Sequence, residues 1–393
     1  MHDIEELVTR GVANIIPQKV ALEKLLESGK KLNIYMGIDP TATKIHLGHT
    51  VGLRKLGEFA KSGHNVTFLI GDFTALIGDT SDKDSERPSL SKEEIEENFR
   101  TYRKQAEKIL DFSKVQVKFN SEWLKKLSFE DIVKLTQHFS AGDFTSRELV
   151  KKRLSEGKKV GLHEFMYPVM QGYDSYFMDT DIQVGGTDQT FNMQAGRTLQ
   201  KDLRNKESFV LTTPILEGPD GRKMSKSYGN AIWLEDTPDD IYAKVMAIED
   251  RLIITYFLLV TYVPAGKIEE YEERLKNENP INIKKILAFE IVKELYSEKD
   301  ANEAQGKFER TVQNKETPQE SELFTFDISE LPIIELLTKT KMANSNSHAK
   351  RLIEQGGVSI NDKLIENSAD FIKLDKVLFL KVGKRRVVKI TSK

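Results

Sequence analysis

The sequence predicts an α/β protein with a doubly wound parallel-sheet domain, an all-helical domain and a small α+β domain, in that order. Strand-like apolar runs alternate with amphipathic helical stretches over the first 220 residues, which is typical of βαβ units. From residue 237 onward the apolar spacing is helical, and after a polar stretch the C-terminal end combines short helical and strand-like runs.

The first βαβ unit is the clearest part of this pattern. The strand-like run LNIYMGID (32–39) is followed by the helical stretch 50–64 and by the apolar run NVTFLIGDFTALIGD (65–79). Strand, helix and strand within about 45 residues form a crossover unit, so the two strands should be parallel. Ahead of this unit, residues 4–30 have the spacing of an amphipathic helix.

The alternation continues further along the chain. A helical stretch over 95–112 precedes the strand-like VQVKFN (115–120), and strand-like runs recur from residue 181 and over 209–216. Residues 121–160 are rich in charge, and we expect them to form helices inserted between the two halves of the sheet. The repeat supports a Rossmann-like architecture.

Changes in the pattern suggest the domain boundaries. Thr237 and Pro238 resemble an N-cap and a first helical residue. The stretch QNKETPQESE (313–322) is polar and contains a proline, as linkers do. We predict a Rossmann-like domain over 1–220 with an insertion at about 121–160, a mobile loop and connection over 221–236, a helical domain over 237–312, a linker over 313–328 and a small domain over 329–393.

Composition excludes several classes of protein. The chain has 393 residues and no cysteine, which excludes disulfides and thiolate metal sites and fits a cytoplasmic protein. The longest apolar run, 252–263, is too short to span a membrane and is expected to be a buried helix. The first residues, MHDIEELVTRG, lack the apolar run of a signal peptide.

Charge is distributed unevenly along the chain. Leu331–Lys393 holds thirteen Lys and Arg against six Asp and Glu, a local charge of +7, which leaves −9 on residues 1–330. A basic end on an acidic body suggests a nucleic-acid-binding appendage. A solvated charged face is the alternative that charge alone leaves open.

His46 and His49 flank Gly48 at the predicted start of a helix, in DPTATKIHLGHTVGLRKL (39–56). As metal ligands they lack acids or further histidines at the usual spacing, and a structural role stays open. A phosphate-binding role fits their position after the first parallel strand, because Gly48 lets an anion approach a helix N-terminus. Two imidazoles there could stabilise charge on a departing phosphate.

A second candidate stretch is DGRKMSKSYGN (220–230). It carries Arg222, Lys223 and Lys226 in a polar, glycine-bounded loop. Such a loop could be an ordinary surface turn. It could also close on a pyrophosphate and supply positive charge in the transition state.

The two stretches together, HLGH and then KMSKS about 175 residues later, resemble the signature pair of class I aminoacyl-tRNA synthetases. Within that class, nearly the whole chain resembles the bacterial-type tyrosyl-tRNA synthetases, in the branch with a compact C-terminal domain. HLGH departs conservatively from the more frequent HIGH. The matching stretches are YMGIDPTATKIHLGH (35–49), GDTSDKDSER (78–87), YPVMQGYD (167–174), QVGGTDQTFN (183–192) and KMSKS (223–227).

The resemblance implies roles for particular residues. The tyrosine-binding set is Tyr35 and Asp174 at the phenol, Asp79, Tyr167 and Gln171 at the α-ammonium group, and Gln183 and Gln189 at the polar end. The ATP-binding set is Asp39, Thr41, Gly48, Asp188, Lys223, Ser225 and Lys226. The groups expected to act on the phosphates are His46, His49, Lys83, Arg87, Lys223 and Lys226.

The C-terminal stretch NSNSHAKRLIEQGGVSIND (344–362) resembles a small ribosomal-protein-like RNA-binding module. The resemblance implies contacts with RNA from Ser345, Ser347, His348, Lys350 and Arg351. It also implies tRNA(Tyr), L-tyrosine and ATP with Mg²⁺ as substrates, no structural metal, and a homodimer formed largely through residues 121–160.

The expected activity is therefore that of a tyrosine–tRNA ligase, which makes tyrosyl-adenylate and pyrophosphate and then charges the tRNA. Three alternatives stay open. A tryptophan-specific relative is disfavoured by Asp174 paired with Tyr35, which suits a phenol. A non-catalytic RNA-binding protein or splicing helper is disfavoured by the complete histidine and lysine motifs. A cofactor-making nucleotidyltransferase would not need the RNA-binding end.

Overall fold

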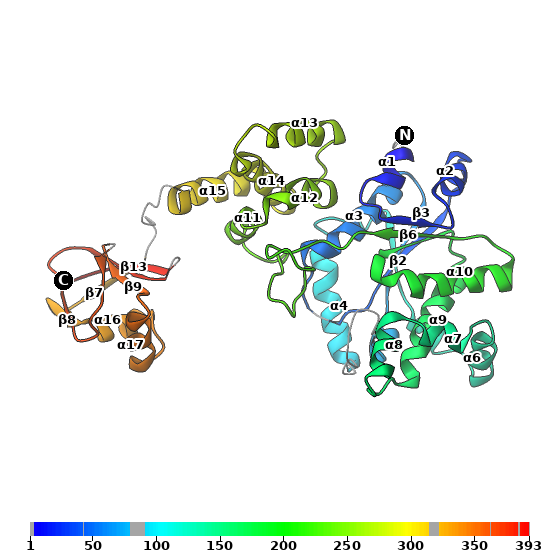
Figure 1. Cartoon of the computed structure of the whole chain (residues 1–393), viewed down its shortest axis with the longest axis horizontal. Coiled ribbons are helices and arrows are strands. Elements are labelled where there is room, and N and C mark those ends of the chain that lie inside the picture. The colour runs from blue at the N-terminus through cyan, green and yellow to red at the C-terminus, as the bar shows by residue number, and fades with distance from the viewer. Residues whose placement is uncertain are drawn as a thin grey trace. The chain divides into compact units, whose positions relative to one another are not determined.

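The computed structural model describes residues 4–41, 43–78, 91–313, 322–361, 363–383 and 386–392 of the chain. The chain divides into two compact units, Met1–Gln305 and Gly306–Lys393 (Figure 1). The first unit contains a large parallel sheet with its helices and a helical segment that follows it. The second unit contains a small domain rich in strands.

Within the described residues, six strands form the main sheet in the order β1-β6-β5-β2-β3-β4. All neighbouring pairs from β6 to β4 are parallel, as the alternating sequence pattern predicts. The order reverses at β2, which lies between β5 and β3, and such a switch point is where open α/β sheets bind ligands. The parallel strands are β2 (Asn33–Ile38), β3 (Asn65–Ile70), β4 (Val115–Phe119), β5 (Ile182–Gly186) and β6 (Phe209–Thr213).

The prediction of one helix over residues 4–30 is wrong. The structure has α1 (Ile4–Thr9), the short strand β1 (Asn14–Ile16) and α2 (Lys19–Glu27). Gly11 has a φ of +64°, which ends the helical path. The three residues of β1 then pair antiparallel with β6, adding an edge strand that helical spacing could not reveal.

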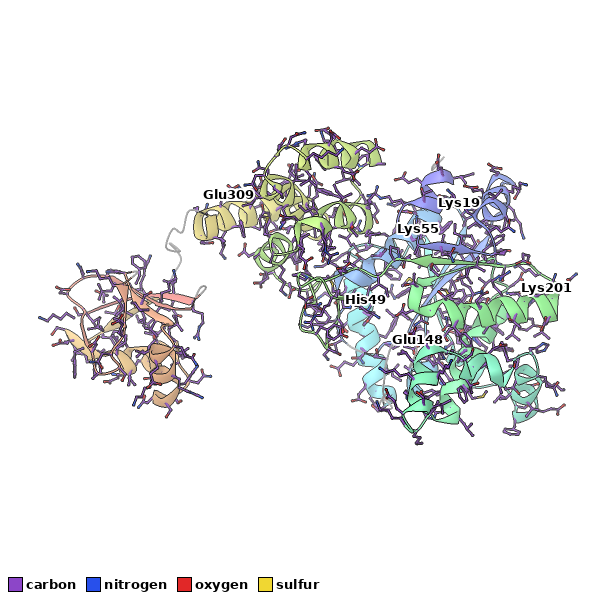
Figure 2. The ribbon with its side chains drawn as sticks, viewed as in Figure 1. Lys19, His49, Lys55, Glu148, Lys201 and Glu309 are labelled. Carbon is purple, nitrogen blue, oxygen red and sulfur yellow. The ribbon has the colours of Figure 1, made fainter. Side chains whose placement is uncertain are left out.

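Helix α3 (Leu47–Lys61) is buried on nearly all sides and contacts β2, β3 and β5. Two of its charged residues are buried as well, and both join it to other helices. Arg54 Nη2 lies 2.7 Å from Glu294 Oε2 in α14 (Pro280–Leu295), and Lys55 Nζ donates to the Leu7 carbonyl at 3.0 Å. Figure 2 labels Lys55 and, at the start of the same helix, His49.

The other helices of the sheet region follow the predicted order. The expected helical insertion contains α5 (Ser121–Leu124), α6 (Phe129–Thr136), α7 (Ala141–Thr145) and α8 (Glu148–Ser155). Around it lie α4 (Lys92–Ala106), α9 (Leu162–Phe177) and α10 (Thr190–Arg204).

The segment after the sheet is helical from the predicted start. Thr237 caps it, since its hydroxyl accepts from Asp240 N at 3.2 Å, and Pro238 is the first helical residue. This segment belongs to the same compact unit as the sheet, and α12 contacts α3. None of the helices in the described ranges is long and apolar enough to cross a membrane. The helices are α11 (Pro238–Met246), α12 (Ile253–Val260), α13 (Ala265–Leu275), α14 and α15 (Glu298–Phe308).

The second unit packs helices on a small sheet, whose described strands have the order β10-β9-β12-β13-β7. Its core includes Leu336, Leu337, Leu380 and Ile390, all fully buried. The remaining elements are α16 (Ile333–Lys339), α17 (Asn346–Glu354), β8 (Glu330–Pro332), β9 (Val358–Ile360), β10 (Lys363–Leu364), β11 (Phe371–Lys373), β12 (Leu378–Val382) and β13 (Arg386–Ser392).

The predicted linker over 313–328 extends too far. Strand β7 (Leu323–Phe326) falls inside it and pairs in parallel with β13, so its last residues belong to the C-terminal sheet. A four-residue edge strand next to a polar stretch gives too short an apolar run to be recognised from spacing alone.

Candidate active site

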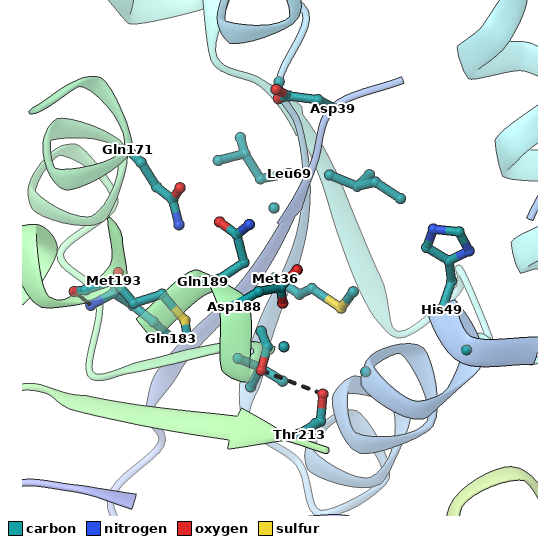
Figure 3. Close-up of a pocket in the computed structure, with 18 of the residues that line it drawn as sticks. Met36, Asp39, His49, Leu69, Gln171, Gln183, Asp188, Gln189, Met193 and Thr213 are labelled. Atoms are coloured by element: carbon teal, nitrogen blue, oxygen red, sulfur yellow. Dashed lines mark hydrogen bonds between the residues drawn. The ribbon is translucent and has the colours of Figure 1, made fainter. Parts of the chain in front are cut away.

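The main pocket opens at the carboxyl ends of β2 and β5 and has a volume of about 330 Å³. Figure 3 shows His49 on the opposite side of this pocket from Gln171 and Gln183. Most of the site residues predicted from the sequence line it, namely Tyr35, Asp39, Thr41, His46, Gly48, His49, Tyr167, Gln171, Asp174, Gln183, Asp188, Gln189, Lys223 and Ser225.

Of the described residues in the predicted active-site set, Lys226 is not among those that line the pocket. It lies exposed on the loop after β6. Asp79, Lys83 and Arg87 lie outside the described residues.

One end of the pocket is built around the Tyr35 hydroxyl, which donates to Gln183 Oε1 at 3.1 Å. Gln183 is oriented in turn by its own amide, which donates to the Met193 carbonyl at 2.9 Å. Burial raises the pKa of Tyr35 well above its usual value, and the carboxyl of Asp174 raises it further. Tyr35 therefore presents a neutral hydroxyl.

Asp174 lies at the same end of the pocket, where the resemblance to the family pairs it with Tyr35 around the substrate phenol. Its oxygens accept from Trp123 Nε1 at 2.7 Å and from Asn120 Nδ2 at 3.2 Å. Burial raises the pKa of Asp174 to about 8, against the lowering effect of these two hydrogen bonds. The carboxyl is thus held in place and is largely protonated at neutral pH.

A chain of hydrogen bonds connects this carboxyl to a second one. Asn120 Nδ2 also donates to Thr74 Oγ1 at 3.0 Å, and the Thr74 hydroxyl donates to Asp39 Oδ1 at 2.7 Å. The Tyr167 hydroxyl donates to the other oxygen of Asp39 at 2.8 Å. Asp39, predicted for ATP, therefore lies next to Tyr167, which was predicted for the amino group of tyrosine.

The other end of the pocket holds the two histidines. His46 is the N-cap of α3, and its backbone N–H donates to His49 Nδ1 at 3.2 Å. A neutral His49 therefore carries its proton on Nε2. Burial, with a smaller contribution from the Lys223 ammonium, lowers the pKa of His46 to about 2 and that of His49 to about 4. Both imidazoles are neutral at physiological pH and can act as hydrogen-bond donors.

The two histidine rings lie close together, with centroids 3.8 Å apart. His46 Nδ1 is buried and has no hydrogen-bond partner within the described part of the chain. Since a buried polar atom without a partner is costly, this atom is placed to gain from a ligand that can bond to it.

Two glycines of α3 allow backbone and side chains to approach closely here. A Cβ on Gly48 would lie 3.0 Å from the His46 ring, and one on Gly52 would lie 2.8 Å from the Met36 sulfur. Real Cβ atoms essentially never come as close as the second distance. A methyl group at Gly52 would therefore displace the end of the flexible Met36 side chain, and one at Gly48 would crowd the His46 ring.

The loop over 220–230 brings the lysine motif to the same end. Lys223 Nζ lies 3.3 Å from Asp188 Oδ2, an acid predicted for the ribose. Met224 is buried, and its N–H donates to the Leu216 carbonyl at 2.9 Å. The Asn230 amide closes the loop by donating to Asp220 Oδ1 and accepting from Ser225 N.

The segment that follows this loop pairs with the start of α3. Leu47 N donates to the Ile232 carbonyl and Leu234 N donates to the Ile45 carbonyl, each at 2.9 Å. His46 and Trp233 form the β-bridge between these two bonds. Backbone hydrogen bonds therefore join the start of α3 to the segment that follows the KMSKS motif.

The predicted RNA-binding residues lie in the second unit, from the N-cap of α17 to Arg351 in its last turn. Ser345 is the N-cap, with its hydroxyl accepting from His348 N at 3.1 Å. Ser345, Ser347, Lys350 and Arg351 are exposed, whereas Ala349 faces the core. The basic side chains thus share an accessible helix surface.

The sequence interpretation missed Thr74, Asn120 and Trp123, which hold the two carboxyls. A usable signal existed for Asn120, because it directly follows the strand-like run VQVKF, at the edge where parallel sheets bind ligands. Trp123 gives no such signal, since a tryptophan in a short helix is usually a core residue.

Across the ranges that the structure describes, no group of three or more His, Asp or Glu side chains is arranged to hold a metal ion.

The comparisons with known proteins agree with this geometry. The sequence profile of the tRNA synthetases class I (W and Y) matches residues 27–313. The chain is 41% identical over 390 residues to the tyrosine–tRNA ligase of Thermotoga maritima, covering 98% of this chain and 97% of the relative. It is 44% identical over 399 residues to that of Carboxydothermus hydrogenoformans, with the same coverage.

Solved structures of tyrosyl-tRNA synthetases have the same fold as this chain. A C-terminally truncated mitochondrial tyrosyl-tRNA synthetase from Coccidioides posadasii has a TM-score of 0.64 at 26% identity, covering 77% of this chain and 91% of that one. The tyrosyl-tRNA synthetase of Archaeoglobus fulgidus in complex with L-tyrosine has the same fold, with a TM-score of 0.61 at 24% identity and coverage of 77% and 100%. By its profile match, its relatives and its fold, the chain belongs to the class I tRNA synthetases of the W and Y group.

Proposed function

We propose a role for each group of pocket residues in the reaction of an ATP-dependent tyrosine–tRNA ligase. This is the activity that the family and the relatives indicate. The enzyme first joins tyrosine and ATP into tyrosyl-adenylate and pyrophosphate, and then transfers tyrosine to the 3′ end of tRNA(Tyr), releasing AMP. The observation that carries the proposal is one pocket with a hydroxyl and a carboxyl at one end and two imidazoles and an ammonium at the other.

The Tyr35 and Asp174 end would hold the substrate phenol. A phenol can both donate and accept, and this end offers a hydroxyl and a carboxyl in fixed positions. Phenylalanine has no hydroxyl and would make neither of these additional hydrogen bonds, each worth about 0.5–1.5 kcal/mol net. An indole offers only a donor, so the same pair favours tyrosine over tryptophan.

The charged groups of the amino acid would lie at the middle of the pocket. The Asp39 carboxylate, which accepts from the Tyr167 hydroxyl, suits an α-ammonium group, and Gln171 lines the same pocket. We propose that Asp79 assists there. Gln183 and Gln189 would lie next to the carboxylate that attacks the α-phosphate.

The histidine and lysine end would stabilise charge on the departing pyrophosphate. His46 and His49 are neutral and would donate hydrogen bonds, and Lys223, Lys226, Lys83 and Arg87 would add positive charge. Mg²⁺ would arrive with ATP, bound to its phosphates as part of the substrate. No side chain forms a covalent intermediate, because the substrate carboxylate is itself the nucleophile.

Tyrosine-dependent exchange of labelled pyrophosphate into ATP tests the proposal. We expect exchange with tyrosine and little with phenylalanine or tryptophan. Lys226→Ala should slow adenylate formation far more than it weakens tyrosine binding, because the exposed ammonium reaches the phosphates only when the loop closes. No exchange with tyrosine, or stronger exchange with tryptophan, contradicts the assignment.

A homodimer is the second part of the proposal. The predicted dimerisation region and the start of α9 expose large apolar side chains, with Phe129 and Leu162 each 81% exposed. Such side chains are typical of protein interfaces. Leu162→Glu should shift the sedimentation of the protein toward that of a monomer, whereas a variant that sediments like the wild type counts against this surface.

The exposed basic face of α17 would bind the tRNA. We also propose that the enzyme acts in the cytoplasm, where charged tRNA is used. Replacing both Lys350 and Arg351 with Ala should weaken tRNA binding and reduce its salt dependence, without changing tyrosine-dependent exchange.

A further inference from the structure

Helix α4 has a buried polar face that the proposed function leaves unexplained. Asn98, Tyr102 and Gln105 are spaced by four and three residues, so they lie on one side of the helix. Asn98 is 8%, Tyr102 3% and Gln105 1% exposed. Buried amides need hydrogen-bond partners, so this face marks a contact that depends on them.

The amide of Gln105 is bonded on both sides to the connection between β2 and α3. Its Nε2 donates to the Thr43 carbonyl at 2.8 Å, and its Oε1 accepts from Ile45 N at 2.7 Å. Asn98 makes a single bond of the same kind, from Nδ2 to the Pro40 carbonyl at 2.8 Å. These backbone groups belong to an irregular segment, which cannot satisfy them through a ladder or a helix.

The connection matters because of what lies at its two ends. It leaves the sheet at Asp39 and reaches α3 at His46, and both residues line the pocket. Gln105 itself is not among the residues that line the pocket. Gln105 can therefore influence the pocket only through the backbone of the connection, to which its amide is bonded.

The same end of α4 also holds the segment that follows the lysine loop. The Ile45 carbonyl accepts from Leu234 N at 2.9 Å, so Ile45 lies between Gln105 and that segment. In the turn after the helix, Lys108 Nζ donates to the Leu234 carbonyl at 2.6 Å. The C-terminal end of α4 and the turn after it thus bind both backbone segments that pair at the β-bridge between His46 and Trp233.

We propose that Gln105 is a positioning residue for the nucleotide: it fixes the backbone at Ile45 and thereby the place where His46 and His49 meet the ATP phosphates. The identity of the nucleotide rests on the proposed function. Donors to a transferring phosphate must be placed accurately, and a shift of about 1 Å can lower the rate by up to about 10²-fold.

Gln105→Met in the full-length chain tests the proposal, because Met has a similar volume and no amide. We expect kcat/KM for ATP in adenylate formation to fall about 10- to 100-fold. The Kd for tyrosine should stay within about twofold, since Tyr35 and Asp174 are held by other contacts. Gln105→Glu should recover part of the loss, because it keeps an acceptor for Ile45 N, and burial favours its protonated form, which can donate to Thr43.

Gln200→Met is the matched control. Gln200 is also fully buried, and its amide donates to the Ser175 carbonyl at 2.7 Å, away from the connection. It should lower Tm by a similar amount and leave the ATP dependence of adenylate formation unchanged.

Three outcomes would overturn the proposal: an unchanged ATP dependence in Gln105→Met, an equal loss in tyrosine binding, or an equal ATP effect in the control. If Gln105→Met does not fold, Asn98→Ala carries the test, with a smaller loss in the same direction expected. Wild-type protein without tyrosine-dependent exchange would refute the proposed function instead, so the two failures can be told apart.

Discussion

The two ends of the pocket are built in different ways. At the phenol end, Tyr35, Asp174 and Gln183 are almost fully buried and already hydrogen bonded to protein partners. At the phosphate end, His46 Nδ1 has no partner among the described residues, and Lys226 is exposed on a loop. The first end is organised before any ligand arrives, and the second is completed by one.

This difference matches what each end must do. Selecting tyrosine requires buried groups that cannot adapt to a wrong side chain. Stabilising a departing pyrophosphate requires groups that are best satisfied in the transition state. Substitutions at one end of the pocket should therefore leave the binding of the substrate at the other end unchanged.

The largest effect is expected at the phosphate end. Lys223→Ala and His49→Ala should each slow tyrosyl-adenylate formation about 10²- to 10³-fold, because each removes a group aimed at developing charge. The Kd for tyrosine should hardly change. Rapid-quench measurement of adenylate formation, beside equilibrium binding of tyrosine, checks this.

Arg222→Ala is the control on the same loop. Arg222 is exposed, pairs with Asp220 at 2.6 Å and is not among the residues that line the pocket. If Lys223→Ala forms the adenylate as fast as Arg222→Ala, the two ends do not differ as described. The same holds if its tyrosine binding weakens by the same factor as its rate of adenylate formation falls.

An intermediate effect is expected at the phenol end. Asp174→Ala should lower the preference for tyrosine over phenylalanine about 10- to 100-fold, since the phenol then loses its carboxyl partner in a buried site. The KM for ATP should not change. Exchange assays with both amino acids measure this ratio, and wild-type discrimination in the variant would show that the phenol is held elsewhere.

The last effect concerns the folded state and not the reaction, and it is a change in the pH dependence of stability. Burial raises the pKa of Asp174 to about 8, so the folded state holds a proton that the unfolded state releases near pH 4. Stability contributed by this proton is present at low pH and is lost as pH rises from about 4 to 8.

Asp174→Asn removes that titration. The Tm of the Asp174→Asn variant minus that of the wild type should therefore rise between about pH 4 and pH 8 and level off above pH 8. A difference in Tm that is constant between pH 5 and 9, measured by calorimetry, would place the carboxyl in a less buried setting than the structure shows.

Much of the fold was predictable because parallel strands and helices leave strong periodic patterns. The runs at 32–39, 65–79 and 115–120 contain β2, β3 and β4. The edge strands β1 and β7 were missed because three or four residues carry no period. Parallel pairing was predictable from spacing, whereas the antiparallel partner of β6 was not.

The site was predictable only in part, for a similar reason. Motifs identify residues such as His46 and Lys223, because these motifs have a fixed spacing and a known chemistry. Asn120, Thr74 and Gln105 act by holding other groups, and any polar residue in the right place could do so. Their roles depend on three-dimensional neighbours that a sequence does not display.

The glycines of α3 have a consequence for engineering the enzyme to withstand heat. Replacing a helical glycine with alanine commonly adds about 0.5–1 kcal/mol of stability. At Gly57 a new methyl group would meet Leu110 at an ordinary 3.5 Å, so this position can be improved. At Gly52 it would meet the Met36 sulfur at 2.8 Å under the pocket. Within one helix, thermal tolerance can therefore be raised at Gly57 without rearrangement, whereas the same change at Gly52 would move a methionine that lines the pocket.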